Sequence, residues 1–255
     1  MISKQIHRFF VYQNGMSLLE LLIAMALSSL LTLTLVHMAM AARNSFRLQE
    51  SLAELQENAR FFADLVSSSI ADSAYHPEPW LHEATPIGLM PGSADGTGPN
   101  SDRLISRSWS EHNCFGTLNS ATDSAGLPRF YLKESTLELN SGSLAHSCRY
   151  GPSVDAMITQ INRQGAVPQV EVFQALYASD TDGDGQIDSW LRAGQWDSPE
   201  KVRAVRLGIL SSSRESIAPT QASVFQILDF SYTAPADGRL RRVASYTLPL
   251  NRPWP

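Results

Sequence analysis

The hydrophobic pattern begins with a long apolar run near the N-terminus. Residues 21–42 carry no formal charge, and Glu20 is the only formally charged side chain between Met16 and Ala42. A helix needs roughly 20 apolar residues to cross a hydrocarbon core of about 30 Å, so this run is long enough. We therefore predict one transmembrane helix over residues 16–42.

From residue 43 the sequence becomes polar but keeps apolar side chains on one helical face. Within residues 43–72 they recur at alternating steps of four and three, at Leu48, Leu52, Leu55, Ala59, Phe62 and Val66. That spacing is typical of an amphipathic α-helix. We expect the membrane helix to continue through this segment and to end near Ile70. The alternative, an independent coiled coil after the anchor, is disfavoured because the pattern lasts under three heptads.

The rest of the chain predicts a β-rich head. Residues 75–102 are rich in proline, glycine and serine, a composition typical of a loop. Runs of strand-favouring residues follow, divided by turns such as Asn140-Ser141-Gly142, and they cover residues 129–133, 136–139, 170–177, 202–210 and 225–233. We predict an α+β fold, a ladle in which the long N-terminal helix packs on a mainly antiparallel β head formed by residues 73–255.

The extreme N-terminus indicates the orientation in the membrane. Residues 1–15 contain Lys4 and Arg8 and no acidic side chain. By the positive-inside rule this leader stays in the cytoplasm, and the head lies on the far side of the inner membrane. The alternative is a conventional secretory signal cut near Ala42, but the apolar run is longer than the 7–15 residues usual in such signals.

Gly15 and Met16 stand immediately before the apolar run, and Glu20 follows four positions after Met16. This arrangement resembles the class III signal of type IV pilins. The resemblance implies that an aspartyl prepilin peptidase cuts after Gly15, that the new N-terminal Met16 is methylated, and that the apolar helix survives processing. Phenylalanine is commoner than methionine after the cut, so Met16 departs from the usual pattern.

Glu20 needs a partner, because a charge near the bilayer interior costs about 2.5–3.5 kcal/mol on insertion scales. In the pilin family, the glutamate at this place pairs with the α-amine of a neighbouring subunit and sets the register of the incoming helix. The resemblance implies the same role for Glu20. The alternative is that Glu20 lies hydrated at the cytoplasmic headgroup level.

The charge balance and the cysteine content disfavour two classes of function, nucleic-acid binding and zinc binding. The 255 residues are 43% hydrophobic and 18% charged, and the formal net charge is −5, which gives no overall electrostatic reason to bind nucleic acid. The two cysteines, Cys114 and Cys148, lack zinc-site spacing. In an oxidising compartment one disulfide between them is favoured, and closing this loop contributes about 3–4 kcal/mol. Two free buried thiols are the alternative.

An aspartate-rich segment predicts a cation site. Carboxylates stand at loop positions one, three, five and nine, glycine stands at position six, and a backbone carbonyl is offered at position seven, so the candidate ligands are Asp180, Asp182, Asp184, Gln186 and Asp188. This spacing suits structural Ca²⁺, which takes six to eight oxygen ligands. Leu191 replaces the bidentate glutamate of an EF-hand, so an EF-hand proper is excluded. The alternative is an acidic hairpin turn that needs no ion.

Further segments resemble the PilW family of minor pilins. They are residues 56–61, which read Gln-Glu-Asn-Ala-Arg-Phe, then Phe130-Tyr131, the aspartate loop and residues 201–210. The resemblance implies a non-enzymatic subunit that primes type IV pilus assembly and joins the filament or its tip complex, in support of motility, adhesion and DNA uptake. The central position of the cysteines also favours a minor rather than a major subunit.

The partners and localisation follow from that resemblance. The expected partners are other minor pilins, the major pilin, prepilin peptidase, the inner-membrane assembly platform and a large tip adhesin. No cofactor is required, and structural Ca²⁺ is the candidate ion. The protein would span the inner membrane once, with its head in the periplasm, and would reach the cell surface within the pilus.

Two other functions remain open. A J-type minor pseudopilin of a type II secretion system shares the leader, the helix and a sheet-rich head. A membrane-anchored periplasmic enzyme is the more distant alternative, because the six histidines are scattered without ligand spacing and no nucleophile motif is present. We therefore expect no catalytic activity.

Overall fold

The computed structural model describes residues 16–71, 73, 92–96, 102–198 and 201–250. Gly15 and most of the loop predicted at residues 75–102 therefore lie outside the described residues. The chain divides into two compact units, Met1–Leu48 and Gln49–Pro255.

The described part of the first unit is helical. It holds the first part of α1 (Leu18–Ile70), which is the one helix in the described chain that is long and apolar enough to cross a membrane. Serine and threonine hydroxyls in this part of α1 donate hydrogen bonds to backbone carbonyls of the same helix. The Oγ of Ser28 donates to the carbonyl of Ala24, and the Oγ1 of Thr32 donates to the carbonyl of Ser28. Such bonds satisfy polar groups that hydrocarbon would leave without partners. The predicted helix is therefore present, and its apolar part has the length and composition of a membrane span.

The second part of α1 buries one face in the head. Four of the predicted apolar positions, Leu55, Ala59, Phe62 and Val66, are buried, together with Ser51, Asn58, Leu65 and Ile70. The prediction was wrong for Leu48 and Leu52, which are exposed. Polar side chains share the buried stripe instead, and the Nδ2 of Asn58 bonds to the carbonyl of Pro168.

The first sheet is antiparallel and has the order β1-β2-β3-β4. Its strands are β1 (Arg103–Ser110), β2 (Tyr131–Asn140), β3 (Ser143–Gly151) and β4 (Ile158–Pro168). The turn predicted between β2 and β3 is present, with Ser141 and Gly142 both at positive φ. The two runs predicted at residues 129–133 and 136–139 form the single strand β2, because Glu134 and Ser135 continue the extended backbone between them.

The second sheet is also antiparallel and has the order β10-β7-β5-β6. Its strands are β5 (Val170–Ser179), β6 (Ser189–Leu191), β7 (Val202–Ser216) and β10 (Arg239–Pro249), and a short helix η1 (Val154–Ala156) precedes β4.

The run predicted at residues 225–233 is not one strand but a separate hairpin of β8 (Ser223–Ile227) and β9 (Phe230–Ala234). The turn was missed because the hydrophobic run continues through Leu228, which takes a positive φ.

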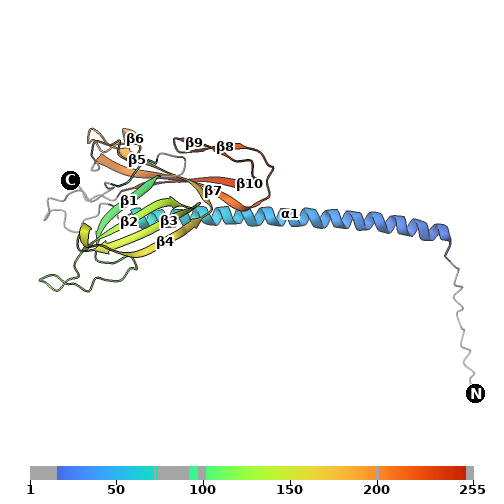
Figure 1. Ribbon diagram of the computed structural model, residues 1–255, viewed down its shortest axis with the longest axis horizontal. Coiled ribbons are helices and arrows are strands. Elements are labelled where there is room, and N and C mark those ends of the chain that lie inside the picture. The colour runs from blue at the N-terminus through green and yellow to red at the C-terminus, as the bar shows by residue number, and fades with distance from the viewer. Residues whose placement is uncertain (1–15, 72, 74–91, 97–101, 199–200, 251–255) are drawn as a thin grey trace, which may run out of the picture. The chain divides into compact units, whose positions relative to one another are not determined.

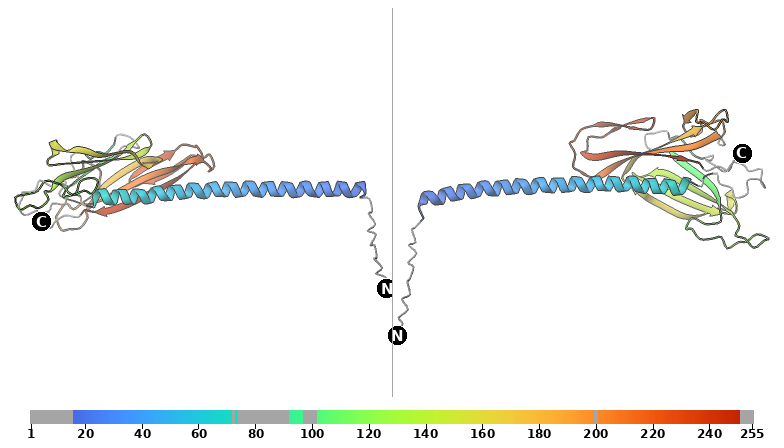
Figure 2. Two further views of the ribbon diagram at one scale, coloured as in Figure 1. Left: turned by 90° about the horizontal axis from the view of Figure 1, so that it is seen from below. Right: turned by 180° about the vertical axis from the view of Figure 1, so that it is seen from behind.

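The main core lies between α1 and both four-stranded sheets. Phe62 and Val66 of α1 pack in one cluster with Leu137 of the first sheet and with Phe173 and Leu207 of the second. Figures 1 and 2 show the C-terminal half of α1 running alongside strands of both sheets. Burying each of these large side chains contributes about 1.5–3 kcal/mol. The predicted α+β class, with a helix packed on antiparallel sheets, is confirmed.

Candidate functional site

The N-terminal end of α1 carries the residues assigned to processing and assembly. Met16 is 72% exposed and precedes the helix, and Ser17 caps the first turn by accepting a hydrogen bond from the amide of Leu19 at its Oγ. Glu20 lies in this first turn and has no ion pair among the residues that the structure describes. Within the described chain, the end of the helix therefore carries a carboxylate without an ion-pair partner next to the predicted mature N-terminus.

The two cysteines are joined, as the sequence predicts. Cys148 lies on β3 and is buried, whereas Cys114 lies in the connection from β1 to β2, and their Cα atoms are 6.0 Å apart. The amide of Cys114 also donates to the Oε1 of Gln160 on β4. The disulfide and this bond together fasten the connection to the sheet.

The connection from β1 to β2 contains two regular turns that the sequence analysis did not predict. The Oδ1 of Asn113 accepts from two amides of one turn, and the Oδ1 of Asp123 does the same in the next turn. Gly116 and Gly126 provide the positive φ that each turn requires. The two repeats of Asn or Asp followed three residues later by Gly were a detectable signal for these turns.

The aspartate loop connects β5 to β6. The structure brings carboxylate oxygens of Asp180, Asp182 and Asp188 within 4.8 Å of one another. Ligands at 2.3–2.6 Å from one Ca²⁺ are at most about 5 Å apart, so these three groups suit a shared cation. The predicted ligand Asp184 is not part of this group, and its Oδ1 accepts the amide of Gln186, the remaining predicted ligand.

A cation from the protein itself reaches this loop. Arg203 of β7 places Nε and Nη2 at 2.9 and 2.8 Å from the Oδ2 of the buried Asp180. Burial raises the pKa of Asp180. Hydrogen bonds from Arg203 and from the amides of Gly183 and Gly185 lower this pKa by more than burial raises it, so the pKa lies below its usual value. Asp180 is therefore held as a carboxylate with one neighbouring positive charge.

Asp188 is also held in its charged form. The hydroxyl and the amide of Thr181 both donate to its Oδ2, and these hydrogen bonds lower its pKa. The nearby Lys201 contributes a smaller lowering and donates from its Nζ to the carbonyl of Thr181. The loop thus presents ionised oxygens, the ligand type that hard cations prefer.

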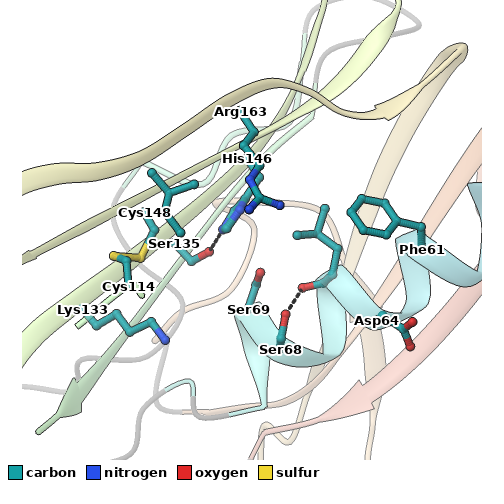
Figure 3. A pocket seen from close by; sticks show the side chains of 12 residues that line it. Phe61, Asp64, Ser68, Ser69, Cys114, Lys133, Ser135, His146, Cys148 and Arg163 are labelled. Atoms are coloured by element: carbon teal, nitrogen blue, oxygen red, sulfur yellow. Dashed lines mark hydrogen bonds between the residues drawn. A yellow bond between two sulfur atoms is a disulfide. The ribbon is translucent and has the colours of Figure 1, made fainter. Parts of the chain in front are cut away.

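A cavity of about 410 Å³ lies between α1 and the first sheet, and the sequence predicted no binding role for the residues that line it. Its helical wall consists of five side chains, Phe61, Asp64, Leu65, Ser68 and Ser69 (Figure 3). The opposite wall is formed by alternate positions of three neighbouring strands and by the disulfide, with Lys133, Ser135, His146, Cys148, Ile161, Arg163 and Cys114.

His146 is the titratable group in the middle of the strand wall. Its Nε2 lies 2.8 Å from the Oγ of Ser135, a residue that is itself buried. Burial lowers the pKa of His146, and the positive charges of Arg163 and Lys133 lower it further. The imidazole is therefore neutral near pH 7, and the two formal positive charges of this wall belong to the lysine and the arginine.

Two family models match the chain. The model described as Type IV Pilus-assembly protein W covers residues 130–251, and the prokaryotic N-terminal methylation motif covers residues 11–36. The first match spans most of both sheets, including the aspartate loop, and the second spans the predicted cleavage site and most of the apolar run. None of the curated proteins matches the chain.

Two solved structures are distantly similar. A type IV-like pilin from Thermus thermophilus shares 18% sequence identity, covers 77% of this chain and 96% of its own, and has a TM-score of 0.47. A chain from a binary complex of two pseudopilins of the type 2 secretion system of Vibrio vulnificus shares 13% identity, covers 82% of this chain and 99% of its own, and has a TM-score of 0.37.

Proposed function

Because the chain belongs to the PilW family of type IV pilin-like proteins, we propose that it is a minor pilin that helps to prime pilus assembly and is incorporated in the filament or its tip complex. The observation that carries this proposal is the order of the two matches, with a methylation motif on an apolar N-terminal helix ahead of a pilus-assembly head. The chain is anchored in the inner membrane by α1, and its head lies in the periplasm.

The proposed role is structural rather than catalytic. Its partners would be other minor pilins, the major pilin, the assembly platform and a tip adhesin, and the consequences for the cell would be motility, adhesion and DNA uptake. The pilin family supports assembly with other pilins, because its members share the N-terminal helix that enters filaments.

Processing is the first step of the proposed pathway. Prepilin peptidase would cut between Gly15 and Met16 and leave Met16 as the methylated N-terminal residue. The exposed position of Met16, outside the first helical turn, supports this assignment because a peptidase needs an accessible backbone. Glu20 would then pair with the α-amine of a neighbouring subunit, and its exposed, unpaired position in the first turn supports this role.

Calcium at the aspartate loop is a further part of the proposal. Asp180, Asp182 and Asp188 would supply carboxylate oxygens, and the ion would stabilise the connection between β5 and β6. The protein's own residues already restrict this loop, since Asp180 binds two loop amides and Arg203.

The decisive experiment combines intact mass measurement and N-terminal sequencing with a pilus assay. Protein would be isolated from membranes with and without prepilin peptidase, and a Gly15→Val variant would serve as the uncut control. We expect peptidase-dependent loss of residues 1–15, one added methyl group on Met16, and loss of surface pili when the chain is deleted. A chain that retains Met1 or is cut near Ala42 would contradict the processing step.

The same deletion distinguishes a role in a type IV pilus from a role in a type II secretion system. If pili persist and protein secretion across the outer membrane stops, the chain is a pseudopilin of a type II secretion system and the pilus proposal is wrong. If pili are lost and secretion continues, the proposal stands.

A further inference from the structure

The cavity between α1 and the first sheet is lined on its strand side by one face of that sheet. Side chains alternate across a strand, so Lys133 and Ser135 of β2 share a face, as do His146 and Cys148 of β3 and Ile161 and Arg163 of β4. The register confirms this, because Ser135 pairs with Cys148 and Cys148 pairs with Ile161. The cavity wall is therefore a fixed part of the sheet rather than a loop.

The positive charges of this wall have no carboxylate partner among the residues that the structure describes. Neither Lys133 nor Arg163 forms an ion pair with any described residue, whereas Arg107 and Arg149 on the same sheet both bind the buried Glu134. Asp64 is the acidic side chain of the lining, and it is exposed and forms no ion pair within the described chain. Within the described residues, the cavity lining thus carries two unpaired positive charges on the strand wall and one negative charge, Asp64, on the helical wall, so its formal charge is positive with His146 neutral.

The cavity is also lined by uncharged polar groups and by apolar side chains. The Oγ of Ser69 is buried and has no hydrogen-bond partner in the described structure, and Ser135 contacts His146 beside it (Figure 3). Leu65 and Ile161 line the cavity from opposite walls, and Phe61 lies on the same helical side. The lining thus combines apolar side chains with charged and hydroxyl groups, and its volume lies within the 300–1,000 Å³ that is typical of small-molecule sites.

We propose that this cavity binds a small organic acid, with its carboxylate beside His146 and its apolar body against Leu65 and Ile161. The charges of Lys133 and Arg163 both act on the imidazole of His146, so a carboxylate at this point is attracted by both. The hydroxyl of Ser69, which has no partner in the described structure, supplies a donor on the helix side, and Ser135 lies next to His146 on the strand side. The cavity lining includes no residue of the predicted membrane-spanning segment 16–42 or of the aspartate loop, and its test does not require pilus assembly.

Benzoate is a suitable probe, because it joins one carboxylate to a small ring, and benzamide is its uncharged isostere. The full chain, with ¹³C-labelled histidines and in lipid nanodiscs, would be titrated with each compound by NMR. We expect saturable shifts of the His146 ring signals with benzoate and at least tenfold weaker binding of benzamide. The bound anion should also raise the pKa of His146, since it offsets the two positive charges.

Charge-removal variants locate the binding. Lys133→Gln and Arg163→Gln should each weaken benzoate binding by about tenfold, the effect of losing one charged hydrogen bond. Arg242→Gln is the matched control, because Arg242 is exposed on β10 away from the cavity lining, and it should bind as the unchanged chain does. Thermal unfolding would verify that all three variants are folded.

Four results would overturn the proposal. Three are the absence of a saturable shift of His146 with millimolar benzoate, equal binding of benzoate and benzamide, and unchanged binding in both folded charge-removal variants. Weakening in Arg242→Gln equal to that in the cavity variants would also overturn it, because general surface charge would then explain the attraction.

Discussion

At the scale of single residues, the least expected group is the carboxyl of Asp102. It is 4% exposed, and it accepts hydrogen bonds from the amide of Ala175 on β5 at 2.8 Å and from the amide of Gly96 at 3.2 Å. Burial raises the pKa of Asp102 to about 6, although both hydrogen bonds lower it. The residue thus connects residues 92–96 to the central part of the second sheet at an energetic cost when it is charged.

This pKa predicts that the head loses stability as the pH rises. The folded pKa of Asp102 lies above the unfolded value of about 3.9, so the folded state binds the proton more tightly. Its contribution is therefore fully present below the unfolded pKa and is lost as the pH rises through about 6. Between pH 4.5 and 7 the loss should be about 2 kcal/mol.

Urea unfolding of the chain and of Asp102→Asn at these two pH values measures the effect. The variant cannot titrate at this position, so the difference in unfolding free energy between the two proteins should change by about 2 kcal/mol between the two pH values. A difference that is constant with pH would show that Asp102 titrates normally.

A second residue-scale prediction concerns Arg241, whose side chain is 4% exposed. It binds both oxygens of Glu171 at 2.8 and 3.0 Å and both oxygens of Asp237 at 2.8 and 2.7 Å, and its hydrogen bonds hold the pKa of Asp237 well below the usual range. Arg241→Met should lower the unfolding free energy by about 2–4 kcal/mol, because it removes the buried cation from Glu171 and leaves Asp237 with only the longer contact to Arg239. Chemical denaturation measures this loss.

The neighbouring Arg242→Met is the matched control for Arg241→Met. Arg242 is exposed, so its replacement should change the unfolding free energy by no more than about 0.5 kcal/mol. Equal losses in the two variants would show that the buried arrangement of Arg241 contributes nothing specific.

These residue-scale contacts could not be predicted from sequence. The spacing of the aspartates indicated a cation site, but not that Arg203, 23 residues after Asp180, binds the first of them. That contact depends on the pairing of β5 with β7, which places Ala178 opposite Ala204 and is set by the tertiary packing of both strands. Local spacing predicts residue types in a loop and not the partners that the sheet brings to it.

At the scale of elements, the aspartate loop yields a test for calcium. A site without a bidentate glutamate should bind Ca²⁺ with a dissociation constant near 10⁻³ M, the range of extracellular modules. At 10 mM Ca²⁺ such a site would stabilise the head by about 1.4 kcal/mol, and thermal unfolding with Ca²⁺ or with chelator measures this. An unchanged Tm at 10 mM Ca²⁺ would favour the alternative of a hairpin turn without an ion.

Variants of the loop distinguish the observed cluster from the sequence pattern. Asp182→Asn and Asp188→Asn should each reduce the Ca²⁺-dependent stabilisation, whereas Asp184→Asn should leave it intact, because Asp184 lies outside the group of converging oxygens. If Asp184→Asn removed the effect as fully as the other two, binding would instead follow the predicted five-ligand loop.

The elements themselves were predictable where the hydrophobic period was long. The helix could be predicted to its end near Ile70 because the apolar run and the amphipathic face follow each other without a proline or glycine. The bounds of short strands were harder to predict from the sequence. Residues 225–233 hide a turn inside a hydrophobic run, and β10 was missed because three arginines within residues 239–242 obscure its alternation.

At the scale of the whole molecule, α1 is continuous through the division between the two compact units at Leu48 and Gln49. Its first part carries only Glu20 as a charged side chain within the apolar run, and its second part supplies core residues of the head. Changes near Glu20 should therefore affect assembly without affecting the stability of the head. This separation makes Glu20 the sharpest test of the proposed filament role.

Glu20→Gln should be processed normally and remain in the membrane but fail to enter pili, because a neutral amide cannot pair with the α-amine of a neighbouring subunit as a carboxylate does. Its incorporation should fall at least tenfold in sheared pilus fractions, measured by immunoblot against the membrane fraction. His37→Gln is the control, since it changes a polar side chain of the same helix that has no assigned role. Normal incorporation of Glu20→Gln would mean that this carboxylate is simply hydrated at the headgroup level and that other contacts set the register.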